Sequence, residues 1–330
     1  MVLVARLQAQ APHGTGKAVA ALVAVQLLFG THYSVAREIT AHLDPIAWTA
    51  LRQCGGAILL IGLALALRRP WPRRGWPRLA LLSLLGVVLN QLLFNAGIQR
   101  STALHGVLVM ATVPAQTLAL GVLLGQEALS RRKLASVGLG AAGIAALLQL
   151  DQMAVGTGTW LLTRDGAAAA RFTDTVLFGD LLMFANSAAY SLFMALSKRT
   201  SQQIDPVTLS AAIYLCALPM VALVGAPALA AVDLAAVPSH VWPLGLAVIV
   251  GPTALAYLLN LYALRRLPTS LVGLFINLQF VIAAATAALW HGERLDLRVG
   301  VAAGAVLVGL SLRFLPERPD AAIAPRIAPR

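Results

Sequence analysis

The 330-residue chain is 59% hydrophobic and only 12% charged, whereas soluble domains usually carry about 25% charged residues. This composition excludes an ordinary soluble globular domain and indicates a protein with several membrane spans. The net charge of +12 would also suit a nucleic-acid-binding protein. However, the basic residues lie in short clusters between apolar runs, so we expect them to face a lipid bilayer and expect no nucleic-acid partner.

Runs of sequence without charge define the candidate membrane spans. Between Lys17 and Arg37 lie 19 uncharged residues, enough to cross about 30 Å of hydrocarbon at about 1.5 Å per residue. Further runs of this kind follow at 46–67, 79–99, 102–125, 134–150, 181–197, 206–227, 242–264, 268–290 and 299–315. The sequence therefore predicts an all-α membrane protein with ten transmembrane helices, five in each half.

The two sets of five predicted helices are related to each other. Sliding the sequence by 166 residues places Glu127 on Glu293, each in a polar corner between two apolar runs. We expect both carboxylates to cap or brace these corners. Asp44 and Asp205 open the second and seventh helices in the same way, with Asp as the cap and Pro at the first helical position. A repeat of this length predicts two structurally related halves.

The distribution of Lys and Arg predicts how the chain is oriented. Eighteen basic residues fall on one side of the predicted spans and six on the other, with Arg52 inside a span. Both termini are therefore expected to be cytoplasmic, in an inner membrane. Five spans per half place the halves in opposite orientations, a plan that recurs in transporters. The expected organisation is a first repeat over 1–150, an external linker over 151–178, a second repeat over 179–315 and a cytoplasmic tail over 316–330.

Polar side chains recur at helical spacing in several spans, so each set shares one face of its helix. Buried polar groups need partners or water, and stripes in both halves predict a hydrated centre that binds a small-molecule substrate. Any single stripe has a plainer interpretation as an interhelical hydrogen bond. The candidate substrate-binding residues are Gln26, Tyr33, Arg52, Gln91, Asn95, His105, Thr112, Gln116, Asn186, Tyr190, Tyr257, Asn260 and Asn277.

Other polar residues are expected to lie away from this centre. His32 is off the stripe of its helix and is interpreted as a packing residue. Asn277 and Gln279 point to nearly opposite faces, so at most one faces the centre, and we take Asn277. The fifth, seventh and tenth helices carry few polar residues and should lie outside. Their glycines, Gly138, Gly143, Gly300 and Gly304, indicate close helix packing, with a homodimer face on the fifth and tenth helices as the alternative.

Arg52 is the most informative single residue of the sequence. An arginine within a span is costly and suggests a functional site, although its side chain can also extend to the lipid headgroups. No Asp or Glu lies deep within a predicted span, so coupling through a buried carboxylate has no support. His105 is the available titrating group if protons take part. We expect Arg52 to bind a carboxylate or other anionic group of the substrate.

No catalytic or metal-binding pattern occurs within the predicted spans. His-Glu-x-x-His, Gly-x-Ser-x-Gly and paired carboxylates are all absent from them. Cys54 and Cys216 lie alone in apolar runs and are expected to be small buried residues. We therefore expect no enzyme activity, no cofactor and no metal site.

Over about residues 20–315 the sequence resembles the drug/metabolite transporter superfamily, specifically its ten-helix EamA-type permeases. The most specific segments are Tyr262–Pro268 and Gly292–Leu295, while Phe280 stands where the family usually has proline. The resemblance implies export of small metabolites, often amino acids, by alternating access. It also implies a central cavity lined by helices one, three, four, six, eight and nine. Uptake of similar solutes and a non-transporting membrane protein remain the alternatives.

Overall fold

The structure is a computed structural model, which describes residues 15–98, 100, 109–147, 159–160, 170–171, 174–291 and 297–314. These residues are helical apart from short connections and one two-residue pair, β1 (Thr159–Trp160) with β2 (Ala170–Arg171), whose strands run antiparallel. The all-α class predicted from the sequence is confirmed. His105 and Glu293 lie outside the described residues, as do the side chains of Tyr33 and Arg37.

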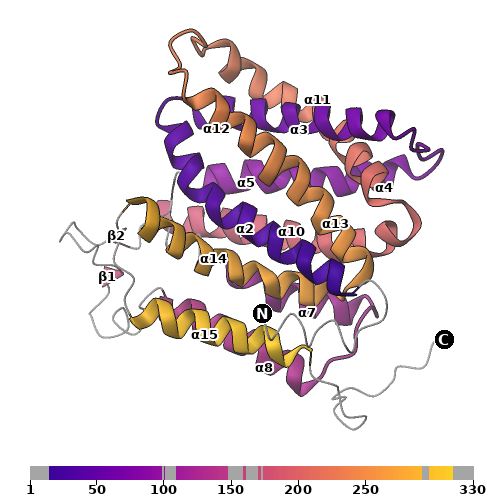
Figure 1. Ribbon diagram of the computed structural model, residues 1–330, viewed down its shortest axis with the longest axis vertical. Coiled ribbons are helices and arrows are strands. Elements are labelled where there is room, and N and C mark those ends of the chain that lie inside the picture. The colour runs from indigo at the N-terminus through magenta and orange to yellow at the C-terminus, as the bar shows by residue number, and fades with distance from the viewer. Residues whose placement is uncertain are drawn as a thin grey trace.

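Helices follow one another along the whole described chain (Figure 1). In the first half they are α2 (Thr15–Thr40), α3 (Pro45–Ala66), α4 (Trp76–Ser83), the π-helical η1 (Leu84–Val88), α5 (Leu89–Ile98), α7 (Val113–Leu123) and α8 (Arg131–Leu147). In the second half they are α10 (Asp174–Gln203), α11 (Pro206–Ala230), α12 (Val241–Val248), the π-helical η2 (Ile249–Leu255), α13 (Ala256–Arg266), α14 (Thr269–His291) and α15 (Leu297–Leu312).

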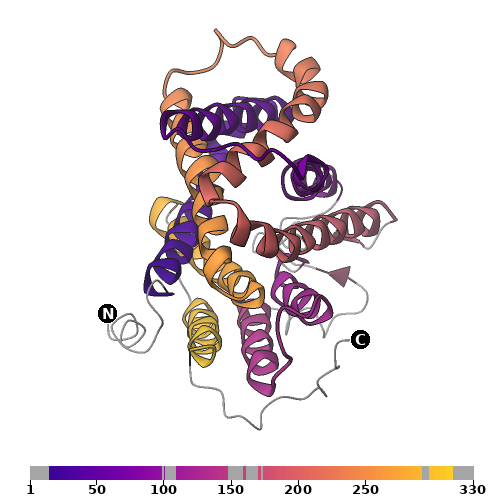
Figure 2. The same cartoon turned by 90° about the vertical axis from the view of Figure 1, so that its right-hand side faces the viewer.

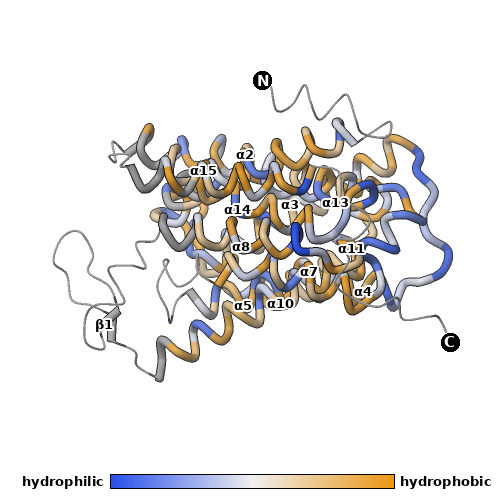
Figure 3. Tube along the Cα trace, turned by 90° about the horizontal axis from the view of Figure 1, so that it is seen from below, coloured by the Kyte–Doolittle hydropathy of each residue, from blue (hydrophilic) through white to orange (hydrophobic). Residues whose placement is uncertain are grey.

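Among the described residues, five helical segments are long and apolar enough to cross a membrane. They are Pro45–Ala66, Trp76–Gly97, Leu177–Gln203, Pro206–Ala230 and Val241–Arg266. Figure 3 shows hydrophobic colour along much of the helices, with hydrophilic segments gathered at the end opposite β1. A chain of several membrane spans is therefore supported, and the count of ten spans stays a prediction.

Two of the helix starts follow the capping rule predicted from the sequence. Asp44 Oδ1 accepts hydrogen bonds from the backbone amides of Ile46 and Ala47, both at 2.9 Å. Asp205 Oδ1 does the same for Val207 at 3.1 Å and for Thr208 at 3.2 Å. The proline that follows each Asp has no N–H to satisfy, so these turns leave few orphan donors.

Equivalent helices of the two halves make equivalent contacts. The second helix of one half packs on that of the other, α3 on α11, and the fifth helices do the same, α8 on α15. Figures 1 and 2 show these two pairs at opposite edges of the molecule. Between them, α2 packs on α13 and α14, just as α10 packs on α5 and α7. The first helix of each half thus packs on the third and fourth helices of the other half, as expected for two related halves that face each other.

The third helix of each half is interrupted by a π-helical segment, η1 in one and η2 in the other. In η2, Pro252 lacks the N–H that a regular helix needs, and Thr253 Oγ donates to the carbonyl of Val248 at 3.0 Å. In η1, a Cβ on Gly86 would come within 2.5 Å of the Phe193 ring, so only glycine permits this close approach to α10. Such wide turns often occur at functional sites.

The glycines of α8 and α15 have different surroundings. Gly309 packs against the backbone of Ser136, because a Cβ there would lie 2.8 Å from its carbonyl oxygen. By contrast, a Cβ on Gly138, Gly300 or Gly304 would meet no atom of the described residues within 4 Å. Close packing among the described residues therefore does not require glycine at these three positions, and a homodimer face there stays a prediction.

Glu127 braces the corner between α7 and α8. Its side chain is 4% exposed, and its carboxylate accepts hydrogen bonds from both the backbone amide and the hydroxyl of Ser270, at the start of α14. Lys133 Nζ lies 3.1 Å and an Arg313 nitrogen 3.7 Å from its Oε2. Burial acts to raise the pKa of Glu127, but the Ser270 hydrogen bonds and the Lys133 charge outweigh it and leave that pKa below its ordinary value.

We predict that Glu127→Gln lowers membrane abundance more than it lowers transport per molecule. The substitution removes the carboxylate that pairs with Lys133, and breaking a buried pair in this way costs about 3–5 kcal/mol. Because the pKa of Glu127 is depressed, its contribution is present at neutral pH and is lost as the pH falls through that pKa. Quantitative blotting and solute flux measure the two effects.

The exposed residue Asp233 supplies the control for this experiment, since Asp233→Asn removes a carboxylate without breaking an ion pair of the described residues. It should leave abundance unchanged. Normal abundance of Glu127→Gln together with abolished transport would show that Glu127 acts in transport and not in folding.

Candidate functional site

A cavity of about 330 Å³ lies between helices of both halves. Its walls come from α2, α3, η1 and α5 of the first half and from α10, α11, η2, α13 and α14 of the second. It reaches Ala36 and Thr40 near the end of α2 and Pro45 and Trp48 at the start of α3. Small-molecule sites usually have volumes of about 300–1,000 Å³, so this cavity suits a small solute.

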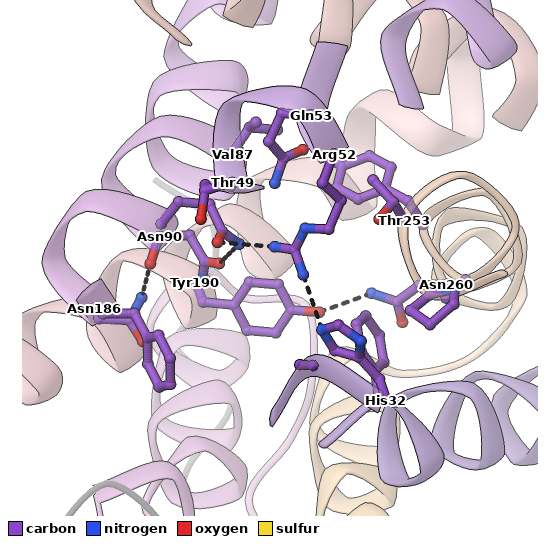
Figure 4. Close-up of a pocket in the computed structure, with 18 of the residues that line it drawn as sticks. His32, Thr49, Arg52, Gln53, Val87, Asn90, Asn186, Tyr190, Thr253 and Asn260 are labelled. Carbon is purple, nitrogen blue, oxygen red and sulfur yellow. Dashed lines mark hydrogen bonds between the residues drawn. The ribbon is translucent and has the colours of Figure 1, made fainter. Parts of the chain in front are cut away.

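Arg52 extends from α3 into this cavity (Figure 4). One terminal nitrogen lies 3.0 Å from His32 Nε2, and the other donates to Gln91 Oε1 at 2.9 Å. Because arginine nitrogens only donate, His32 Nε2 must accept, and the imidazole proton then lies on Nδ1. None of the described residues that line the cavity is Asp or Glu. The guanidinium therefore has neutral partners there and no carboxylate.

Two nitrogen atoms of this group remain without a hydrogen-bond partner among the described residues. Arg52 Nε and His32 Nδ1 are both buried and unpaired. Each carries a proton: His32 Nδ1 because Nε2 is the accepting nitrogen, and Arg52 Nε because all guanidinium nitrogens are protonated. A buried donor without a partner costs about 1–3 kcal/mol. A positive charge with two spare donors is an arrangement that an anionic oxygen would satisfy.

Neutral amides hold the Arg52 partner Gln91 in place. Gln91 Nε2 donates to Asn90 Oδ1 at 3.2 Å, and Asn186 on α10 donates to the backbone carbonyl of Asn90. On the same side, Asn95 Nδ2 donates to Thr49 Oγ at 3.3 Å and connects α5 to α3. The bond to Asn90 uses the Gln91 amide nitrogen, so the Gln91 oxygen, which can only accept, is directed toward Arg52.

Aromatic rings form the wall contributed by the second half. Tyr190 stacks on Phe193 at 5.9 Å between ring centroids, Phe193 contacts Tyr257 at 5.7 Å, and Tyr257 meets Tyr214 edge-on at 5.0 Å. Asn260 Nδ2 donates to the Tyr190 hydroxyl at 3.1 Å (Figure 4). The Tyr257 hydroxyl is buried and has no partner among the described residues. Three of these rings, Tyr190, Tyr214 and Tyr257, line the cavity, with Phe193 buried behind them.

Most of the predicted binding residues with described side chains line the cavity. Those that do are Gln26, Arg52, Gln91, Asn95, Asn186, Tyr190, Tyr257 and Asn260. Whether they bind substrate stays a prediction. Tyr33 and His105 cannot be placed, because the Tyr33 side chain and the whole of His105 lie outside the described part of the chain.

Thr112 and Gln116 do not line the cavity. Gln116 Nε2 instead donates to Thr112 Oγ at 2.8 Å and to Ser187 Oγ at 2.9 Å, while its Oε1 accepts from Ser191 at 2.9 Å. The bonds to Ser187 and Ser191 connect α7 to α10, while the bond to Thr112 stays within the start of α7. The polar stripe of α7 therefore forms interhelical hydrogen bonds, which was the plainer of the two interpretations of its spacing.

The expected choice between Asn277 and Gln279 was wrong, because Gln279 lines the cavity and Asn277 does not. Asn277 is fully buried against α8, where Gly140 leaves room for it: a Cβ on Gly140 would lie 2.3 Å from Asn277 Nδ2.

His32 was interpreted as a packing residue, yet it contacts Arg52 within the cavity. Tyr214 also lines it, although α11 corresponds to a helix that was expected to lie outside.

Comparison with known proteins gives one family and one fold. The sequence profile described as the EamA-like transporter family matches residues 16–149 and again residues 177–315. A solved structure titled "Crystal structure of protein" matches with a TM-score of 0.73 and 18% identity, over 90% of this chain and 96% of that one. At this identity the likeness shows the fold alone. Among curated proteins, no relative matches.

The two cavity tyrosines should respond differently to loss of the hydroxyl. Tyr190→Phe removes the acceptor of Asn260 and leaves a buried donor unpaired, so we predict a loss of about 1–3 kcal/mol in the free energy of unfolding. Tyr257→Phe removes a hydroxyl that has no partner among the described residues and should leave stability unchanged. Thermal unfolding of the purified variants measures both. Equal destabilisation by the two substitutions would contradict this assignment.

Proposed function

The chain belongs to the EamA-like transporter family, and we propose that it exports small carboxylate-bearing metabolites, such as amino acids, across the cell inner membrane. Membership of the family establishes a membrane transporter of small solutes. The anionic substrate class and the outward direction are the proposal. The observation that carries it is the Arg52 guanidinium, which lies in the central cavity without a carboxylate partner among the described residues.

Arg52 provides the chemistry that a carboxylate needs. Its planar guanidinium offers donors in a fork that matches two carboxylate oxygens, and here Nε remains unpaired among the described residues. The alternative, in which the side chain extends to lipid headgroups, is not favoured, because both terminal nitrogens contact cavity residues. The neighbouring aromatic wall suits the apolar part of a small metabolite.

Alternating access requires that one end of the cavity be closed while the other is open. At the end where α7, α10 and α13 finish, Lys198 Nζ donates to the carbonyls of Leu264 and Leu267 at 2.7 and 2.8 Å. Gln126 there donates to the carbonyl of Ala195 at 2.8 Å and accepts from Thr269 at 3.1 Å. The cavity reaches the opposite end, between α2 and α3. In our proposal this is the outward-facing arrangement.

The proposed topology has ten spans in two inverted repeats of five, with both termini in the cytoplasm. The basic clusters support it, since they lie in the connections that the positive-inside rule assigns to the cytoplasm. The exchange of helix partners between the halves supports an inverted relation as well. The closed end of the cavity would then face the cytoplasm.

Cysteine labelling tests this topology. In a chain whose Cys54 and Cys216 are replaced, single cysteines in 151–178 should react with an impermeant thiol reagent added to intact cells. Cysteines in 68–78 should react only after the membrane is permeabilised. The reverse pattern would contradict the inverted-repeat arrangement.

Substitution of Arg52 tests the substrate class. In proteoliposomes, transport of a carboxylate substrate should fall in the order wild type, Arg52→Lys, Arg52→Gln, because Lys keeps the charge without the fork and Gln loses both. Loss of one partner of a partly buried charge pair costs about 2–5 kcal/mol, so Arg52→Gln should weaken apparent affinity by about 30-fold or more. The amide or ester of the substrate should compete poorly.

Arg100→Gln is the matched control, since Arg100 is exposed and lies outside the central cavity. It should retain wild-type apparent affinity. Full transport by Arg52→Gln, or equal competition by an uncharged analogue, would contradict a carboxylate substrate.

A further inference from the structure

Three metal-ligating side chains meet at the end of the molecule where α2 joins α3. Glu38 lies in the last turn of α2, His42 follows that helix, and His240 directly precedes α12. Glu38 Oε1 is 3.1 Å from His240 Nε2 and 3.5 Å from His42 Nε2. One donor atom from each of the three residues lies within 4.8 Å of the others. We propose that these residues form a binding site for a transition-metal cation of the zinc class.

The separations of the donor atoms fit such an ion. Zinc binds imidazole nitrogen and carboxylate oxygen at about 2.0–2.2 Å in a tetrahedral arrangement, which places two of its ligand atoms about 3.3–3.5 Å apart. The two distances from Glu38 Oε1, 3.1 and 3.5 Å, lie at or close to that separation. The imidazole rings stand edge-on to each other, with centroids 5.5 Å apart.

The chemistry of the donors selects the class of ion. Imidazole nitrogen suits zinc, copper and nickel, whereas magnesium and calcium prefer sites built from oxygen alone. Three protein ligands leave a fourth position for water. The side chains of His42, Glu38 and His240 are 35%, 49% and 56% exposed, so an ion in solution can reach them.

Two of the ligands are already positioned by local structure. Glu38 and His42 are four residues apart, the spacing that brings side chains together on one helix face. His240 comes from 202 residues beyond Glu38 in the chain, and only packing of α12 against α2 brings it near. This separation explains why the sequence alone indicated no metal site.

A bound ion would connect α2 to α12 beside the mouth of the cavity. Ala36 and Thr40, on either side of Glu38 in α2, line that cavity. Transport by alternating access changes the spacing of helix ends around the mouth, so an ion that holds α2 to α12 should slow it. This consequence rests on the proposed transport function, whereas binding of the ion does not.

Isothermal titration of the purified, tag-free protein with Zn²⁺ tests the site directly. Wild type should bind Zn²⁺ and not Mg²⁺. Each of Glu38→Gln, His42→Asn and His240→Asn should weaken the affinity by about tenfold or more, because each removes one of three protein ligands. Asp233→Asn, an exposed acidic residue outside the group, should bind as wild type does. Absence of Zn²⁺ binding by wild type, or unchanged affinity in all three variants, would overturn the proposal.

Flux in proteoliposomes tests the consequence separately. Zn²⁺ should slow transport by wild type and leave transport by His240→Asn unaffected. Equal inhibition of both proteins would overturn the proposal that an ion bound between α2 and α12 slows transport. If the wild type transports no solute tested, the calorimetric result still decides the metal site, so failure of one proposal is distinguishable from failure of the other.

Discussion

An arginine held among neutral groups is the constraint on which this structure depends. The Arg52 guanidinium cannot lose its charge, and the described residues around it supply an imidazole and an amide but no carboxylate. A fixed positive charge in an apolar protein is costly, and such residues face the interior of a helix bundle or a water-filled cavity. Helices from both halves line the cavity into which Arg52 extends.

The two-fold arrangement of helices provides that open centre. The α3–α11 and α8–α15 pairs form the edges. Between them lie the third helices of the two halves, which the π-helical segments η1 and η2 interrupt. Gly86 in η1 and Pro252 in η2 both line the cavity, so the irregular turns lie where the substrate would bind. At the other end, the hydrogen bonds of Gln126, Glu127 and Lys198 hold four helices together. One end is thus rigidly connected while the other remains accessible.

Sequence periodicity predicted much of the cavity wall but not all of it. Spacing within one helix shows which residues share a face, and Gln91, Asn95, Tyr257 and Asn260, which were chosen for such spacing, all line the cavity. It does not show how that face is rotated against its neighbours, which is why Gln279 was passed over for Asn277. Nor does it show whether a stripe is satisfied between two helices, as Gln116 is by Ser187 and Ser191. His32 contacts Arg52, and His240 contacts Glu38. Each pair is distant in sequence, so only tertiary packing brings its two members together.

A crystal structure with an iodinated aromatic carboxylate would test the central claim most directly, because iodine can be located by anomalous scattering independently of the protein. The account predicts one iodine site in the central cavity, with the carboxylate oxygens within hydrogen-bonding distance of the Arg52 guanidinium. A carboxylate bound in the cavity but directed away from Arg52, or no iodine in the cavity at saturating ligand, would contradict it.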